Sequence, residues 1–226
     1  MATKVKFCGL KTPEAVRLAA ELGAWKIGFI FFPKSPRNVS VAEAEELGRL
    51  ARELGLETTA VTVNAGESDL AGIVSAVKPD LLQFHGSETP EHVAAMKTRF
   101  KLPAMKAFSI REASDLDAVD AYRGIADYML FDAKAPKGSE LPGGNGVSFD
   151  WSLLGGLRPK LDYVLSGGLT VDNIGEALGQ TGAGFVDVSS GIESAPGIKD
   201  PAKMRAFAAA VRRHDEMQAM TRESVA

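Results

Sequence analysis

Cysteine is nearly absent from this sequence, since Cys8 is the only one in 226 residues. A single thiol cannot form an internal disulfide, which fits a reducing compartment. Long apolar runs are also missing. The sequence has no stretch of roughly 18 apolar residues, the length needed to cross a membrane. We expect no signal peptide, because the residues from Met1 to Lys4 lead straight into a strand pattern. We therefore expect a cytoplasmic protein with no membrane partner.

A dominant charge of one sign is lacking too. Lys and Arg number 26 and Asp and Glu number 29, which gives a net charge of −3, and no basic cluster could follow a phosphate backbone. A nucleic-acid partner is therefore not expected. The three histidines, His85, His92 and His214, are not spaced with carboxylates or thiols as metal ligands are, so we expect no metal.

The sequence does contain a regular alternation of short apolar runs and longer amphipathic segments. The runs are typical of parallel strands that are buried on both faces. They are Val5–Phe7, Trp25–Phe32, Thr58–Val63, Leu81–Phe84, Ala104–Phe108, Tyr128–Phe131, Tyr163–Leu165 and Phe185–Val188. Eight such units in one chain favour a single (β/α)8 TIM barrel over a doubly wound sheet, which also alternates. We expect the barrel to occupy residues 1–214 as one domain, and the polar tail, 215–226, to fray.

Helix-start signals separate these runs. Thr12 stands before a proline, and Ser40 with Glu43 forms the pattern of a capping box. Ser114 and Thr170 are expected to cap the helices after the fifth and seventh runs. The sequence thus predicts a helical segment after each strand.

The ends of the strands supply the candidate catalytic residues, because TIM barrels place their chemistry at the C-terminal ends of the strands. Cys8 follows the first run and Asp132 follows the sixth. A thiol and a carboxyl group that face one pocket suit the removal and delivery of a proton. Each also has an ordinary alternative. Cys8 could be a small buried hydrophobic residue, and Asp132 could be a capping or ion-paired carboxylate.

Two turns rich in glycine and serine follow the seventh and eighth runs, where barrels frequently bind phosphate on backbone N–H groups. A further glycine-rich stretch, Gly143 to Gly146, lies in a long loop, Ala133–Val147, whose length suggests a functional or mobile segment. Tight turns without a ligand are the alternative. The residues expected to bind are Gly144, Gly167, Gly168, Ser189, Ser190 and Gly191. The fold class is therefore a phosphate-binding type of barrel.

Two further side chains follow strands. Arg37 lies in a loop stiffened by prolines after the second run, where its planar fork could grip a carboxylate. The alternative is a solvated surface charge. His85 ends the fourth run and is a candidate for binding the substrate, although a histidine in this position is often only hydrogen-bonded locally.

Seven motifs occur in order along nearly the whole chain, to about residue 213, and by them the sequence resembles the phosphoribosylanthranilate isomerase family of tryptophan biosynthesis. The motifs are Lys6–Leu10, Phe32–Arg37, Gln83–Gly86, Phe131–Asp132, Gly143–Gly146 with Phe149–Trp151, Ser166–Leu169 and Asp187–Glu193. The sequence departs from the family at Phe7 and Phe84, where aliphatic residues are more common, and at Asn145, where a small hydroxyl residue is common.

The resemblance implies an Amadori rearrangement of N-(5-phosphoribosyl)anthranilate into the 1-deoxyribulose 5-phosphate derivative, with no metal or cofactor. It implies that Asp132 is the general acid that opens the sugar ring and that Cys8 is the general base at C2. The anthranilate carboxylate would pair with Arg37, and Asp187 would hydrogen-bond the substrate. The two glycine and serine turns would hold the phosphate.

Two other functions stay open from the residues alone. Another phosphosugar barrel, such as an indole-glycerol-phosphate synthase or a pentose-phosphate epimerase, would need a catalytic lysine and glutamate or a set of metal ligands, and neither is evident. A barrel that binds a phosphate ligand without turnover is the third possibility. The sequence leaves the oligomeric state open between a monomer and a homodimer.

Overall fold

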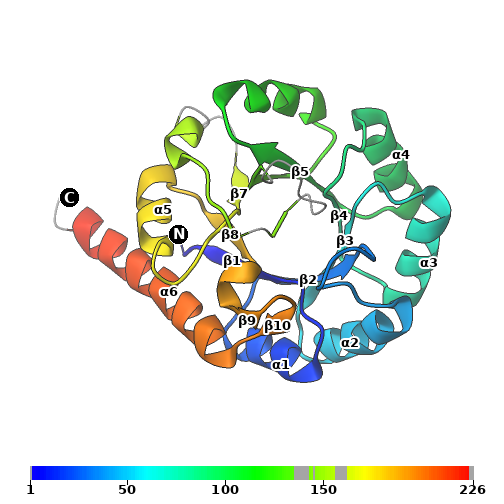
Figure 1. Cartoon of the computed structure of the whole chain (residues 1–226), viewed down its shortest axis with the longest axis horizontal. Coiled ribbons are helices and arrows are strands. Elements are labelled where there is room, and N and C mark those ends of the chain that lie inside the picture. Colours follow the sequence, from blue (N-terminus) through cyan, green and yellow to red (C-terminus); the bar gives the residue numbers. More distant parts are fainter. Residues whose placement is uncertain (1, 135–142, 145, 156–161, 224–226) are drawn as a thin grey trace.

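Eight parallel strands form a closed barrel in the computed structural model, which describes residues 2–134, 143–144, 146–155 and 162–223. Each strand pairs with the next in sequence, and β1 pairs with β8 to close the ring, which Figure 1 shows nearly end on. The strands are β1 (Lys4–Cys8), β2 (Lys26–Phe31), β3 (Glu57–Thr62), β4 (Leu81–Phe84), β5 (Ala104–Ile110), β6 (Tyr128–Ala133), β7 (Tyr163–Leu165) and β8 (Phe185–Val188). The predicted (β/α)8 barrel is confirmed.

Helices surround this barrel (Figure 1). The α-helices are α1 (Pro13–Glu21), α2 (Val41–Glu53), α3 (Glu67–Val77), α4 (Pro90–Phe100), α5 (Ile174–Thr181) and α6 (Pro201–Glu223). Three segments are 3₁₀ helices: η1 (Ala113–Tyr122), η2 (Trp151–Leu154) and η3 (Ser190–Ile192). A small hairpin of β9 (Glu193–Ala195) and β10 (Ile198–Lys199) follows η3. Within the described residues, none of these helices is both long enough and apolar enough to span a membrane.

Side chains alternate between the two faces of the strands. Phe131 joins a large cluster of buried residues that includes Val119 and Trp151 from η1 and η2, whereas its neighbour Leu130 joins a smaller cluster with Met105. This is the period of two that a strand imposes. The sheet is therefore buried on both faces, as the dense apolar runs predict.

The capping predictions have mixed outcomes. Thr12 accepts a hydrogen bond from the N–H of Ala15, and the capping box of Ser40 and Glu43 is present with both of its bonds, as predicted. The prediction for Ser114 is wrong. The segment is a 3₁₀ helix whose N-cap is Glu112, one residue before its first residue, and Ser114 lies within it.

The prediction for Thr170 is wrong as well. The helix begins at Ile174, and Asn173 is its N-cap. The side chain of Asn173 instead accepts from the N–H of Thr170 at 2.8 Å and donates to the carbonyl of Gly168 at 2.9 Å. These local bonds hold the residues after β7 in a turn, because asparagine side chains compete with the backbone of a helix for its partners.

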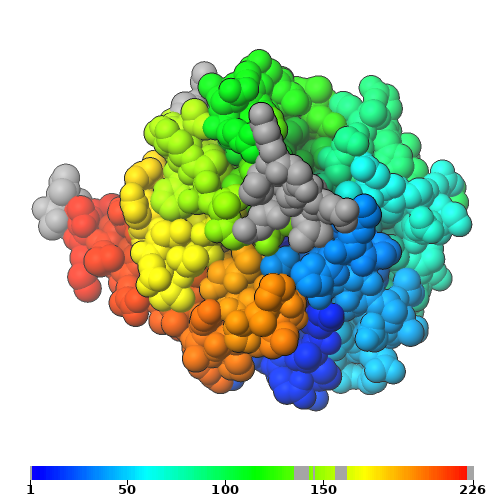
Figure 2. All heavy atoms as spheres, in the orientation of Figure 1, coloured from blue at the N-terminus to red at the C-terminus, as the bar shows by residue number. Residues whose placement is uncertain are grey.

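The C-terminal segment is helical where it was expected to fray. α6 continues to Glu223 and projects beyond the barrel, which Figure 1 and Figure 2 both show. Between Arg213 and Glu223 the sequence contains Ala, Met, Gln, Glu and Arg and has no glycine or proline. Helix propensity therefore favours the continuation of α6. Asp215 also anchors it, because its carboxylate accepts from the N–H and the hydroxyl of Thr3 at 2.8 Å and 2.7 Å.

We predict that Asp215→Ala lowers the free energy of unfolding by about 1–2 kcal/mol, because two hydrogen bonds between α6 and the N-terminal segment are lost. Urea unfolding followed by circular dichroism measures the change. The adjacent exposed carboxylate, in Glu216→Ala, is the matched control and should cost much less. Equal effects of the two variants would show that the contact with Thr3 contributes nothing of its own.

Candidate active site

A pocket opens at the C-terminal ends of the barrel strands. Its lining comes from the ends of β1, β2, β3, β6 and β8 and from the segments that follow β2, β3, β4, β6, β7 and β8. The expected site residues in this lining are Cys8, Arg37, His85, Asp132, Gly144, Gly167, Gly168, Asp187, Ser189 and Ser190. Closure of the barrel therefore brings together residues that lie up to 182 positions apart in the sequence.

Cys8, at the end of β1, is almost fully buried. Its thiol faces Gly28 on β2, where a Cβ atom would come within 2.8 Å of Sγ, so a side chain at this position would displace the thiol. Burial raises the pKa of the Cys8 thiol and the Asp187 carboxylate raises it further, whereas the ammonium groups of Lys6 and Lys199 oppose the rise. The balance is upward, so the neutral thiol is favoured near neutral pH.

A buried ion pair lies next to this thiol. Lys6 Nζ donates to Asp187 Oδ1 at 2.8 Å, and the side chain of Lys6 is 0% exposed. The hydroxyl of Ser166 donates to the other oxygen of Asp187 at 3.4 Å. Burial alone lowers the pKa of Lys6, but the charges of Asp187 and Cys8 outweigh this effect and raise it. Lys6 is therefore an ammonium ion inside the barrel.

Asp132, at the end of β6, faces His85. Its Oδ1 accepts from the backbone N–H of Ala133 at 2.8 Å, and its Oδ2 lies 3.3 Å from His85 Nε2. Gln83 Nε2 lies 3.3 Å from His85 Nδ1 on the other side of the ring. Gly143 packs on this pair, because a Cβ atom there would come within 2.4 Å of Asp132 Oδ2. His85 is thus held locally as well as lining the pocket.

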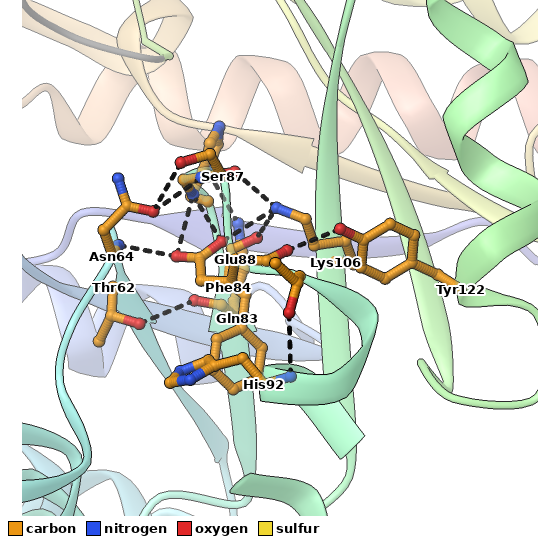
Figure 3. A network of polar contacts seen from close by, with 12 residues as sticks. Thr62, Asn64, Gln83, Phe84, Ser87, Glu88, His92, Lys106 and Tyr122 are labelled. Carbon is orange, nitrogen blue, oxygen red and sulfur yellow. Dashed lines mark hydrogen bonds and ion pairs between the residues drawn. The ribbon is translucent and has the colours of Figure 1, made fainter. Parts of the chain in front are cut away.

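A buried cluster braces the loop that carries His85. The carboxylate of Glu88 accepts from the backbone N–H groups of Asn64 at 2.8 Å and Gly86 at 2.9 Å, and it pairs with Lys106 Nζ at 3.0 Å. Figure 3 shows these groups pointing toward one another. Both members of the ion pair are buried, so the contacts fix the backbone directly after β4.

Arg37 is buried and is not the solvated surface charge considered as its alternative. Its Nε and Nη2 donate to the two carboxylate oxygens of Glu193, each at 2.8 Å, and Nη2 also lies 3.3 Å from the carbonyl of Gly144. The fork therefore grips a carboxylate of the protein itself. Nη1 makes no hydrogen bond to any described residue and lies beside Gly144 in the lining of the pocket.

Lys199 completes this ionic cluster. Its Nζ donates to Glu193 Oε1 at 2.7 Å and to the carbonyl of Ser189 at 3.0 Å. Burial would raise the pKa of Glu193, but the hydrogen bonds from Arg37 and the charge of Lys199 lower it below its ordinary value. Glu193 is consequently a carboxylate that links the loop after β2 to the hairpin after β8.

The turn after β7 has an open backbone. Gly167 and Gly168 have φ angles of 88° and 62°, which favour glycine, and within the described residues neither amide N–H donates a hydrogen bond. After β8, the hydroxyl of Ser189 donates to the carbonyl of Cys8 at 3.1 Å. Free amide groups at this end of a barrel suit an anionic ligand.

One expected binding residue has a different placement. Gly191 does not line the pocket, and a Cβ atom there would lie 1.9 Å from the carbonyl oxygen of Leu169, so this glycine lets the turns after β7 and β8 pack together. Asn145 lies outside the described residues, as does most of the long loop from Ala133 to Val147.

Sequence reasoning did not assign Lys6, Gln83, Glu193 or Lys199 to the site. Lys6 carried a usable signal, because it stands two residues before Cys8 in a strand and so shares its face. Gln83 had the same relation to His85. Glu193 ended the last family motif, but no strand spacing linked it to Arg37. Lys199 had no signal, since the hairpin that carries it follows the last strand of the barrel.

The fold and this pocket define a TIM-barrel enzyme with a buried thiol, a carboxyl group and cationic side chains at the strand ends. Residues 5–210 match the model of the family described as N-(5'phosphoribosyl)anthranilate (PRA) isomerase. The chain belongs to this family and is an isomerase.

Individual relatives agree with this assignment. A protein of Sinorhizobium fredii named N-(5'-phosphoribosyl)anthranilate isomerase is 60% identical over 220 residues, which are 96% of this chain and 97% of the relative. A Brucella canis protein of the same name is 59% identical, over 93% of this chain and 95% of its own length. The crystal structure of phosphoribosyl anthranilate isomerase from Thermotoga maritima has a TM-score of 0.83 and 31% identity, and the match covers 93% of this chain and 98% of that one.

The Glu193 cluster predicts a dependence of stability on pH. Since the pKa of Glu193 is lowered on folding, its contribution is complete above the ordinary glutamate value of 4.5 and is lost as the pH falls below it. The difference in unfolding free energy between the wild type and Glu193→Gln should therefore shrink from pH 7 toward pH 3 in urea titrations. Glu53→Gln, an exposed carboxylate paired with Arg49, controls for charge loss. A constant difference for Glu193→Gln would contradict the prediction.

Proposed function

We propose that the chain catalyses the Amadori rearrangement of N-(5-phosphoribosyl)anthranilate to 1-(2-carboxyphenylamino)-1-deoxyribulose 5-phosphate, a step of tryptophan biosynthesis. The observation that carries this proposal is the placement of Cys8 and Asp132 in one pocket, in a chain of the isomerase family. A solved isomerase with 29% identity and a TM-score of 0.81 is a complex with reduced 1-(o-carboxyphenylamino)-1-deoxyribulose 5-phosphate, which supports a ligand of this chemistry.

Asp132 is the general acid in this proposal. Its carboxyl group gives a proton to the ring oxygen of the sugar, the bond from C1 to that oxygen breaks, and the nitrogen lone pair forms a protonated Schiff base. The position of Asp132 supports the role, because one oxygen is fixed by the N–H of Ala133 and the other points to the pocket beside His85. His85 orients the carboxyl group and contacts the substrate.

Cys8 is the general base. Its thiolate takes the proton from C2, the bonding electrons form the C1–C2 double bond, and the Schiff-base electrons return to nitrogen. The resulting enolamine then tautomerises to the ketone. The raised pKa of the Cys8 thiol means that a nearby cation must favour the thiolate. The substrate supplies one at the right moment, since the protonated Schiff base forms at the neighbouring carbon.

The remaining pocket residues bind the two anionic ends of the substrate. The phosphate lies on the amides of Gly167 and Gly168 and on the turn of Ser189 and Ser190, with Gly191 shaping that turn. The anthranilate carboxylate pairs with Nη1 of Arg37, near Gly144, while the rest of the fork stays on Glu193. Anchoring both ends fixes the sugar between acid and base.

The carboxylate of Asp187 already has partners within the protein, because one of its oxygens accepts from Lys6 and the other accepts from Ser166. In this proposal it hydrogen-bonds a sugar hydroxyl through a remaining lone pair.

A cytoplasmic location and a monomeric or homodimeric state stay predictions of the sequence, which cell fractionation and light scattering would test.

Cys8→Ala and Asp132→Asn should each lower kcat by roughly 10²–10⁴ with the fold intact, because each removes one proton transfer. Loss of the fluorescence of N-(5-phosphoribosyl)anthranilate measures the rate, and circular dichroism checks the fold. Near wild-type turnover in either folded variant would remove that residue from its role. Absence of turnover in the wild type would overturn the proposed reaction.

Arg37→Ala should raise KM more than it lowers kcat, because it removes a contact made in both the ground and transition states. The substitution also frees Glu193, so Glu193→Gln is the matched control. That control keeps the guanidinium and should raise KM less. Unchanged KM and kcat/KM in Arg37→Ala would show that the arginine serves only Glu193.

A further inference from the structure

We propose that Lys6 is a positioning residue for Cys8, and that its ammonium group, held by Asp187 across the seam where the barrel closes, stabilises the thiolate of Cys8 when it forms. This inference rests on the proposed role of Cys8 as the general base. It adds a residue that neither touches the substrate nor lines the pocket among the described residues.

The backbone places the three groups together. Lys6 and Cys8 are two residues apart on β1 and so point to the same face of the sheet. Asp187 is the residue directly opposite Lys6 in the pairing of β1 with β8. The ammonium group can therefore bond to the carboxylate while it lies beside the thiol.

Gly28 shows how close the ammonium group and the thiol are. A single Cβ atom built on this residue of β2 would lie 2.8 Å from Cys8 Sγ and 3.2 Å from Lys6 Nζ. Both atoms thus lie against the same point of the neighbouring strand. Because the surroundings are buried, the interaction between their charges is not screened by water as it would be at the surface.

The charged groups around the thiol come from three elements. Lys6 lies on β1 itself, Asp187 on β8 and Lys199 on β10. The strand β2 presents Gly28 to the thiol, and its Lys26, which pairs with Lys6 in the sheet, is bonded to Glu57. The carboxylate disfavours the thiolate and the two ammonium groups favour it. Lys199 already donates to Glu193 and Ser189, whereas Lys6 donates to Asp187 and also interacts with the charge of Lys26, its partner in the pairing of β1 with β2.

The buried ion pair of Lys6 and Asp187 is by itself weak evidence for a role in stability. A charge without water is costly, and an ion pair replaced by apolar residues of similar volume is often neutral or stabilising. Apolar residues in place of Lys6 and Asp187 would therefore stabilise the barrel interior as well or better. Its role lies in a fixed positive charge next to the thiolate that the base step requires, which opposes the effect of burial and of Asp187 on that anion.

The test measures the thiolate directly and needs no substrate. Cys8 is the only cysteine, so the ultraviolet absorbance of the thiolate, with Cys8→Ser as the blank, reports on this group alone. We expect the titration midpoint to rise by about one pH unit or more in Lys6→Met, which is about tenfold less thiolate at a given pH. Lys6→Arg keeps a positive charge at all pH values, so its titration midpoint should lie close to that of the wild type.

Lys106→Met is the matched control. Lys106 is also a buried strand lysine paired with a buried carboxylate, and its strand, β5, lies opposite β1 in the ring. Its loss should destabilise the protein to a similar degree and leave the midpoint of Cys8 where it is. An unchanged midpoint in Lys6→Met, or an equal rise in Lys106→Met, would overturn the proposal.

A second measurement covers the case in which Lys6→Met does not fold. Coupling between two sites is reciprocal, so the pKa of Lys6 in Cys8→Ser, followed by NMR of the labelled lysine side chain, should be lower than in the wild type. An unchanged pKa would contradict the proposal. The two proposals can fail separately. A raised midpoint in Lys6→Met together with full turnover in Cys8→Ala would remove the role of Cys8 as base but keep the coupling between Lys6 and Cys8.

Discussion

The pairing of β1 with β8 is the constraint on which the rest of the site depends, because it closes the barrel. Without it, the end of the first strand and the ends of the last two would not share a pocket. The same seam carries the buried ion pair, since Lys6 and Asp187 are partners in its register. Closure of the fold and the electrostatic environment of Cys8 thus arise from one set of contacts, which links the stability of the barrel to the chemistry of the thiol.

Charge pairing organises the pocket on two sides. Near the thiol, Asp187 holds Lys6, and on the far side of the turn after β8, Glu193 holds Arg37 and Lys199. In each case a carboxylate neutralises cations that would otherwise be buried alone. The side chains of Lys6, Arg37 and Lys199 are thereby held in fixed orientations before a substrate binds. A doubly charged phosphosugar that also carries a benzoate is the kind of ligand such a pocket suits.

Much of the fold could be predicted from the sequence, because dense apolar runs and capping residues are local signals. β4, β7 and β8 begin and end where their apolar runs do, and the Ser40 capping box is present. The errors have physical causes. The helix after β7 begins later than predicted, with Asn173 in place of Thr170 as its N-cap, because the side chain of Asn173 holds Thr170 and Gly168 in the preceding turn. α6 continued past Arg213 because its polar residues are good helix formers and Asp215 found a partner in Thr3.

The candidate site was less predictable from the sequence, because strand-end positions show which residues meet but not how they pair. The spacing predicted that Cys8 and Asp132 face one pocket, and it gave no sign that Arg37 would grip Glu193.

The central claim, an acid step at Asp132 followed by a base step at Cys8, is tested most directly by the isotope effect with substrate deuterated at C2. The account predicts that the effect is suppressed in Asp132→Asn, where ring opening limits the rate, and large in Cys8→Ser, where proton removal does. A large effect in Asp132→Asn together with none in Cys8→Ser would contradict it.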